Sequence, residues 1–225
     1  MPKLKYIVDQ KIKDLGIHAS VVGEVSGLAI RPTDPELEDL KRNAVAKITS
    51  LSDEEITADP ILESYRSLVQ GRGRSLKKFP PAAENLIHQI RRIGAFPSIN
   101  TAVDSYNIVA AERFLALGVH DAAKLGNTIH FRISEGNEPF TPVGGVETKF
   151  VAQGDFVYAD DTRVLAWLDA KDSDEVKISL TTNDLIIIIQ GTGATTREYN
   201  LSAVTQACCL ITRFCGGDYE AFPIY

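Results

Sequence analysis

The chain has 225 residues, of which 44% are hydrophobic and 24% charged, and its formal net charge is −6. This length suits one domain of ordinary size, or one domain with a small extension, and the composition excludes long disordered tracts. A net negative surface does not attract nucleic acid through bulk electrostatics, so any such contact must come from a local basic patch.

Three features of the sequence predict a cytosolic protein without a membrane partner. The longest apolar run, Leu185 to Ile189, has the length of a strand and is too short to cross a bilayer. The first residues lack the apolar stretch of a secretory signal. The three cysteines, Cys208, Cys209 and Cys215, are odd in number and do not have the spacing of metal ligands, so we expect them to be reduced and partly buried.

Helices dominate the first half of the predicted secondary structure. The expected elements are strands at 6–8 and 19–25 and helices at 35–48, 53–70, 80–93 and 102–117. Asp34 followed by Pro35 is typical of a helix start. The segment Ser52-Asp53-Glu54-Glu55 has the pattern of a capping box, so another helix should begin there.

Strands dominate the second half. They are expected at 128–133, 155–159, 163–168, 176–181 and 185–189, followed by a helix at 201–214. Ile186 to Ile189 is apolar on both faces, which predicts a central strand. Helices first and strands later indicate an α+β fold, with a mixed β-sheet core packed with helices. We expect residues 71–225 to form this domain and residues 1–70 to be an N-terminal α/β extension packed on it.

The sequence offers no strong metal or nucleophile motif. The four histidines, His18, His88, His120 and His130, have no paired spacing, so a surface or capping role is expected for each. The cysteines lie in an apolar helix, where cysteine usually packs as a small hydrophobic residue. We therefore expect neither a metal nor another cofactor.

One basic stripe stands out in this acidic chain. Arg72, Arg74, Lys77 and Lys78 place four positive charges within seven residues, and Arg91-Arg92 follows shortly after. Such a stripe is a candidate phosphate contact. A solvated loop followed by favourable charges at a helix end explains it equally well.

Four blocks of sequence resemble, in the right order, the B3/B4 editing domain of the phenylalanyl-tRNA synthetase β subunit. The first is the segment Ile99 to Val109, which resembles the family's xNxVDxxNxV stretch. The others are Asp121 with Lys124-Leu125-Gly126 and Ile129 to Arg132, then Glu138 to Gly144, then Val157 to Asp161. The resemblance covers about Arg74 to Gly217, whereas residues 1 to about 70 fall outside it.

The resemblance implies a freestanding enzyme that removes wrong amino acids from charged tRNA, with a positioned water and no metal. The resemblance places four residues at the start of the helix in the hydrolytic pocket: Asn100, Thr101, Asp104 and Asn107. It also implies that the basic stripe binds the acceptor end of the tRNA. Asp104 would order Asn107 or accept the α-ammonium group of the substrate. The alternative is that Asp104 and Asn107 only cap and brace the helix. A second alternative is a non-catalytic module that binds tRNA or an amino acid.

Departures from the family pattern concern the side-chain pocket, in which the resemblance places Leu168, Asp169, Ile188 and Gly144. The family's tyrosine-reading acidic residue falls on Ile188, which accepts no hydrogen bond, so tyrosine is not the expected substrate. Asp169 adds a carboxylate that would suit a cationic side chain, such as that of the arginine analogue canavanine, which some freestanding members are linked to removing. The alternative is that Asp169 begins a polar turn and faces solvent.

Overall fold

The computed structural model describes residues 4–225, and it confirms the α+β class. The helices are α1 (Gln10–Lys13), α2 (Pro35–Thr49), α3 (Asp53–Ala58), α4 (Pro60–Gly71), α5 (Ala82–Ile93), α6 (Thr101–Arg113) and α7 (Arg197–Cys215). The strands are β1 (Lys5–Val8), β2 (Val21–Ser26), β3 (Gly118–Asp121), β4 (Thr128–Ile133), β5 (Glu138–Phe140), β6 (Lys149–Val151), β7 (Phe156–Ala159), β8 (Val164–Trp167), β9 (Lys171–Asp172), β10 (Leu185–Ile189) and β11 (Asp218–Pro223). None of these helices has the length and apolar character needed to cross a membrane.

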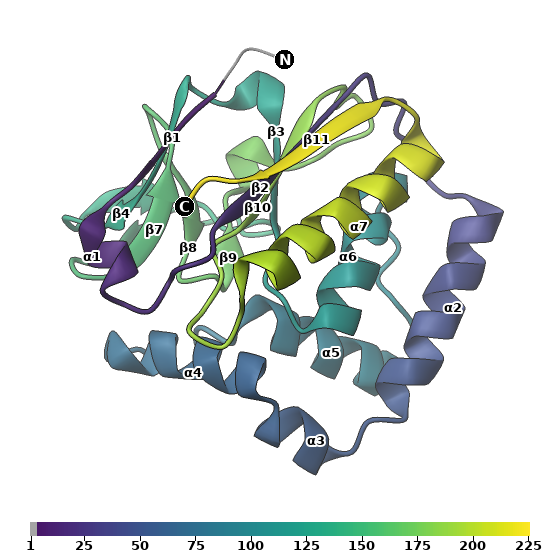
Figure 1. Ribbon diagram of the computed structural model, residues 1–225, viewed down its shortest axis with the longest axis horizontal. Coiled ribbons are helices and arrows are strands. Elements are labelled where there is room, and N and C mark those ends of the chain that lie inside the picture. The colour runs from purple at the N-terminus through teal and green to yellow at the C-terminus, as the bar shows by residue number, and fades with distance from the viewer. Residues whose placement is uncertain (1–3) are drawn as a thin grey trace.

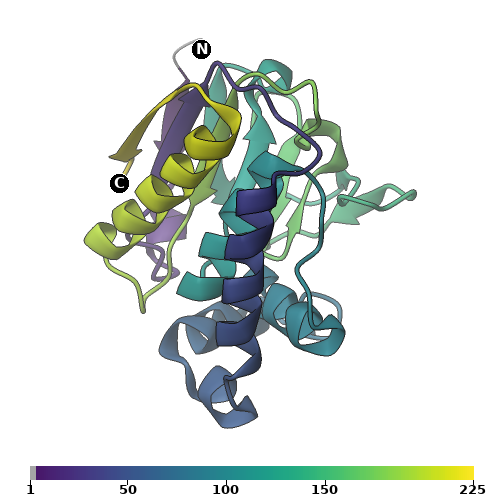
Figure 2. The same ribbon diagram turned by 90° about the vertical axis from the view of Figure 1, so that its right-hand side faces the viewer.

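The strands form two larger sheets and a separate hairpin. One sheet has the order β1-β4-β7-β8-β9, in which β1 runs parallel to β4 and the other neighbours are antiparallel. The second sheet, β11-β2-β10-β3, is antiparallel throughout. Strands β5 and β6 pair only with each other, and this hairpin projects from the body of the molecule in Figure 2.

The four-stranded sheet lies in the middle of a layered structure, and β10 shows why. Ile187 and Ile189 of β10 belong to the apolar core that the sheet forms with α6 and α7. Ile186 and Ile188 point the other way, into the core shared with the five-stranded sheet. Because neighbouring side chains of a strand point to opposite faces, a strand buried on both faces must be apolar at every position. The prediction of a central strand is confirmed, and Figure 1 shows the helices gathered along one side of the sheets.

Residues 4–30 are part of this core. Strand β1 pairs with β4 along Lys5 to Val8, and β2 lies between β10 and β11. The boundary expected near residue 70 is not visible in the strand pairing, because both sheets need the N-terminal strands to close their cores. Within residues 4–71, the segment from α2 to α4 is helical and lies to the side of the sheets (Figure 1).

Several expected elements change at their ends. Asp59 caps α4 and Pro60 is its first residue, so the single helix expected at 53–70 is two helices, α3 and α4. Helix α6 ends at Arg113, four residues early, because Phe114 adopts a left-handed conformation with φ 58°. The prediction of a strand at 176–181 is wrong. This segment follows directly from a short 3-10 turn that ends at Val176, and it pairs with no strand.

Candidate functional site

The residues at the start of α6 stabilise this helix through buried hydrogen bonds to backbone groups. Asn100 is its N-cap residue, and its Oδ1 accepts a hydrogen bond from the Val103 backbone N–H at 2.9 Å. Thr101 is fully buried, and its hydroxyl oxygen accepts from the Arg31 backbone N–H at 3.0 Å. Both side chains therefore satisfy backbone groups, and neither is part of the walls of the cavities described below.

Asp104 forms a buried ion pair with Lys41 of α2. The Lys41 Nζ lies 2.7 Å from Asp104 Oδ2, and the two side chains are only 4% and 1% exposed. The other oxygen, Oδ1, accepts from the Ile99 backbone N–H at 3.0 Å. Lys41 also donates to Ser98 and Glu38. Burial lowers the pKa of Lys41, but the carboxylates of Asp104 and Glu38 outweigh this effect and raise it. The structure thus gives Asp104 a cation from the protein itself, in place of the substrate ammonium group that the sequence suggested.

Asn107 lies one turn further along α6 and does reach an opening. It lines a cavity of about 300 Å³ between α5 and α6, together with Tyr106 of the same helix. Asn85 and Gln89 of α5 form the opposite wall, and Asp172 of β9 closes one end. Of the four α6 residues singled out from the sequence, Asn107 is the one that the structure places at a cavity.

Three cavities meet at Asp172, and together they form what we call the Asp172 cleft. The second is small, about 60 Å³, and is lined by Asp169, Tyr158 and Gly118 among others. The third, about 340 Å³, is largely apolar and contains Gly144 in its wall. Remaining residues of the third wall come from α6, β3 and the segments around β9: Ile99, Val103, Tyr106, Val119, Val143, Asp174, Lys177 and Ile178.

A tight turn between β8 and β9 brings Asp169 into this cleft. Leu168 and Asp169 both have positive φ, 58° and 48°, between the paired residues Trp167 and Lys171. Two successive left-handed residues are typical of the hairpin turns that glycine and asparagine favour, so a leucine and an aspartate here are strained. Leu168 packs in the core and Ile188 lies between the sheets, so neither lines a cavity of residues 4–225.

Asp169 is buried with an acceptor left free. Its Oδ1 accepts from Gln190 Nε2 at 2.5 Å, whereas its Oδ2 and the Gln190 Oε1 have no hydrogen-bond partner in the described chain. Burial raises the pKa of Asp169 to about 7, and burial together with the nearby Asp169 raises the pKa of Asp172 to about 8. The alternative in which Asp169 faces solvent is wrong, since the residue is only 9% exposed.

A histidine and a tyrosine support the floor of the small cavity. The His120 Nε2 and the Tyr158 Oη lie 2.8 Å apart, and both residues are buried. Burial lowers the pKa of His120 to about 3, so its ring is neutral, and the surface or capping role expected for it is wrong. A Cβ at Gly118 would lie 1.7 Å from the Tyr158 Oη, so only glycine leaves room for this hydroxyl.

Tyr158, Asp172 and Gln190 escaped the sequence analysis. Tyr158 lies in the Val157 to Asp161 block that resembles the family, but no role in a pocket was expected for it, and Asp172 and Gln190 lie in no recognisable motif. The run of four acidic residues and one lysine between 169 and 175 was the available signal, and it resembles an ordinary polar turn.

The basic stripe divides into paired and free charges. Arg74 Nε lies 2.8 Å from Oδ1 of the buried Asp155, and Arg91 forms an ion pair with Asp53. Lys77, Lys78 and Arg92 are exposed, and Arg72 is half-buried at the end of α4. Arg74 and Arg91 therefore have structural partners, and three of the six side chains are well exposed.

The stripe is joined to the cleft through Phe79. The Phe79 ring packs edge-on against Trp167, with the ring centroids 4.7 Å apart. The Lys171 ammonium group lies 4.6 Å from the Phe79 ring centroid, and Lys171 itself lines the small cavity. Lys77 and Lys78, both exposed, directly precede this phenylalanine in the chain.

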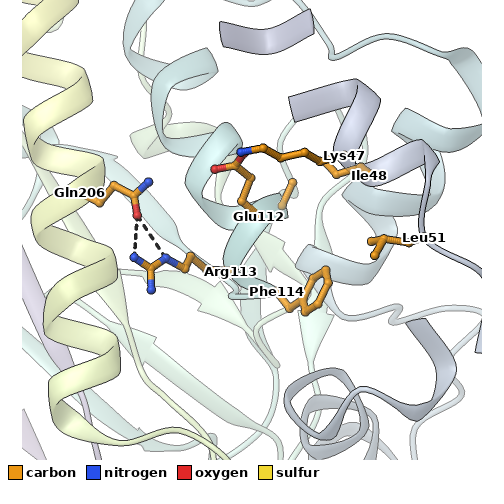
Figure 3. A pocket seen from close by; sticks show the side chains of 8 residues that line it. Lys47, Ile48, Leu51, Glu112, Arg113, Phe114 and Gln206 are labelled. Atoms are coloured by element: carbon orange, nitrogen blue, oxygen red, sulfur yellow. Dashed lines mark hydrogen bonds and ion pairs between the residues drawn. The ribbon is translucent and has the colours of Figure 1, made fainter. Parts of the chain in front are cut away.

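A separate hollow of about 360 Å³ lies between α2, α6 and α7 (Figure 3). Its charged groups are already paired: Lys47 Nζ lies 2.7 Å from Glu112 Oε1, and Arg113 donates to Gln206 Oε1 through Nε and Nη2. Because the polar ends of these side chains already have partners inside the protein, this hollow offers less to a ligand than the Asp172 cleft does.

The fold and the cleft define an α+β domain with an acidic cleft between a helical layer and the strands. The sequence model of the B3/4 domain matches residues 64–216, well over half of the chain, so the protein belongs to the B3/4 domain family. Among solved structures, the chain is similar to an N-terminal fragment of the phenylalanyl-tRNA synthetase β-subunit from Pyrococcus horikoshii. The TM-score is 0.51 at 16% sequence identity, over 99% of this chain and 54% of that one. The chain thus spans about half of that fragment, and the likeness concerns the fold. No curated protein matches it.

Proposed function

We propose that the protein is a trans-acting aminoacyl-tRNA deacylase, which hydrolyses the ester of a mischarged tRNA. The observation that carries this proposal is the Asp172 cleft, whose walls contain Asn107 of the family's motif and two carboxyl groups without a counterion, Asp169 and Asp172. The family and the fold shared with a phenylalanyl-tRNA synthetase β-subunit fragment support the same substrate.

An aminoacyl ester is already activated, so the enzyme has only to hold it, orient a water molecule and stabilise the oxyanion. Asn107 carries an amide whose N–H groups suit the oxyanion, and it lines the cavity from a rigid helix. Asn100, Thr101 and Asp104 would contribute by fixing the start of that helix. The backbone around Gly144 forms part of the neighbouring wall and would contact the bound substrate.

The side-chain pocket favours a cationic amino acid. Asp169 Oδ2 is a buried acceptor without a donor, and a guanidinium or ammonium group would satisfy it. Ile188 offers no hydrogen bond to a tyrosine hydroxyl, and Leu168 fills space near the same turn. We infer an arginine analogue such as canavanine as the substrate.

The tRNA would approach over the exposed end of the basic stripe. Lys77, Lys78 and Arg92 are free to contact phosphates, and Lys171 lies at the mouth of the small cavity. The acidic remainder of the surface, with the net charge of −6, would limit binding elsewhere. The acceptor end would then enter the cleft beside Phe79.

A deacylation panel tests this function. Arginine tRNA charged with canavanine and other mischarged tRNAs are incubated with and without the protein, and the release of the amino acid is followed. We expect faster release with the protein, and a loss of about 10²- to 10³-fold for Asn107→Ala, because an oxyanion donor is removed.

The matched control is Asn85→Ala, which removes an amide from the opposite wall of the same cavity. It should retain most of the activity. Salt-dependent tRNA binding without turnover, weakened by Lys77→Ala and Lys78→Ala, would select the non-catalytic binding module instead. An untouched panel without tRNA binding would refute both.

A further inference from the structure

Asp172 has a position that no other residue in the described chain shares, because it lines all three cavities of the cleft. Its side chain is half-buried and has neither a hydrogen-bond nor an ion-pair partner within residues 4–225. The main chain of β9 holds it in place: Asp172 pairs with Ala166, and its carbonyl accepts from the Val143 backbone N–H at 2.9 Å. The backbone is fixed, whereas the carboxyl group is free to react.

The groups that face Asp172 are acidic or phenolic. Asp169 approaches from the β8–β9 turn, Tyr158 from β7 and Tyr106 from α6. The charge of Asp172 contributes to raising the pKa of both tyrosines, so both remain protonated at neutral pH. These neighbours do not neutralise Asp172, and they leave its carboxylate as the strongest base in the cleft.

The nearby lysines are engaged elsewhere. Lys171, the preceding residue, places its ammonium group over the Phe79 ring. Lys177 lines the third cavity but pairs with Asp174, with Nζ 2.9 Å from Oδ1. Asp174 also accepts from the Gly144 backbone N–H at 3.1 Å. Two acids of the same segment therefore differ: Asp174 is neutralised, and Asp172 is not.

We propose that Asp172 is the general base of the cleft, a role that rests on the hydrolytic function proposed above. The oxygen of a water molecule adds to the ester carbonyl carbon while one of its protons passes to the Asp172 carboxylate. The tetrahedral intermediate then collapses, the bond between the carbonyl carbon and the ribose oxygen breaks, and Asp172 returns the proton to that oxygen. The products are the free amino acid and a ribose hydroxyl group.

The two acids of the cleft would then have separate tasks. Asp169 is held by Gln190 in the small cavity, where it would bind the cationic part of the substrate. Asp172 lies where that cavity opens into the two larger ones, so it can face a water molecule at the ester. A bound cation also favours the ionised form of Asp172, because opposite charges lower a carboxyl pKa. Substrate binding would thus switch the base on.

The test is Asp172→Asn, which keeps the shape and removes the base. We expect kcat to fall about 10²- to 10³-fold while KM changes less than threefold, since positioned acid–base groups contribute at this level. Asp169→Asn should mainly raise KM and weaken selection of the cationic substrate. Glu112→Gln, in the separate hollow, changes the net charge equally and should leave activity unchanged.

The pH profile gives a second measurement. After the uncatalysed rate is subtracted, wild-type kcat/KM should rise with pH, reach half of its maximum near pH 8 and level off above it, because Asp172 acts unprotonated and its pKa is about 8. Asp172→Glu should keep the rise at a lower rate, and Asp172→Asn should be flat.

The outcomes separate the two proposals. If the wild type deacylates no tRNA, the proposed function is refuted, and the role of Asp172 as its general base is refuted with it. If the wild type is active and Asp172→Asn stays within threefold of it, only the base is refuted. Should Asp172→Asn fail to fold, a wild-type profile without the rise refutes the base, and the Asp172→Glu profile supports it if the rise persists.

Discussion

Two regions of the molecule differ in whether their charged side chains have partners: the hollow between α2, α6 and α7, and the Asp172 cleft. In the hollow, Lys47 is paired with Glu112 and Arg113 with an amide of α7. In the cleft, the buried Asp169 and the half-buried Asp172 lie near each other, and neither forms an ion pair within residues 4–225. Burying a carboxyl group without a partner lowers the stability of the folded state, and the fold itself does not require such a group in the cleft. Each of the two larger cavities of the cleft is similar in size to the hollow, so the chemistry of their walls distinguishes the two regions.

The start of α6 refines this comparison. Asp104 is even more deeply buried than Asp169, but Lys41 neutralises it. Burial of an acid therefore does not by itself mark a site in this protein. The absence of a counterion marks the site, because a ligand can supply the positive charge that the protein does not provide.

The largest effect is expected from Lys41→Ala. This change leaves Asp104 buried without its counterion and should lower the free energy of unfolding by about 3–5 kcal/mol. Urea unfolding measures it. The control, Lys47→Ala, breaks a pair whose lysine is 70% exposed and should cost less than about 1 kcal/mol. Equal losses in the two variants would contradict the distinction between the regions.

A smaller loss is expected from Gly118→Ala. The added methyl group collides with the Tyr158 hydroxyl and should cost about 1–3 kcal/mol by overpacking the small cavity. Tyr158→Phe in the same chain should recover part of the loss, since it removes the atom that collides. Thermal unfolding of the two single variants and the double variant decides whether the effects are coupled. Simple additivity would show that the contact is absent.

A gain in stability is expected from Asp169→Asn, and it should depend on pH. The folded protein holds the proton of Asp169 more tightly than the unfolded chain does, so wild-type stability falls as pH rises from about 4 towards about 7. The neutral variant lacks this penalty, which is about 1.4 kcal/mol for each pKa unit. Unfolding at pH 5 and pH 8 should show the variant's advantage growing by at least about 1 kcal/mol. A constant difference would argue against the buried carboxylate.

The smallest effect is expected in the hollow. Glu112→Gln removes a partly exposed pair and should change the free energy of unfolding by no more than about 0.5 kcal/mol at any pH between 5 and 8. A larger or pH-dependent change would mean that this region, too, stores electrostatic free energy. Urea titrations at both pH values measure it.

Local patterns in the sequence determined much of this protein. Ile186 to Ile189 predicted a strand buried on both faces, and Ser52 to Glu55 predicted a helix start, because burial on a strand and capping of a helix act between near neighbours. Asp59-Pro60 carried the signal for the break between α3 and α4, although the helical spacing around it concealed the signal. The family motif led to Asn107.

The tertiary structure alone decided which acids stay unpaired. Asp104 met Lys41, sixty-three positions away, whereas Asp169 and Asp172 met each other across a tight turn. Val176 and Ile178 alternate with polar residues as the apolar residues of a strand do. Both are buried, but a turn buries them, and a turn requires no pairing with another strand. Pairing of charges depends on which distant segments come within a few ångströms, and no local spacing encodes that distance.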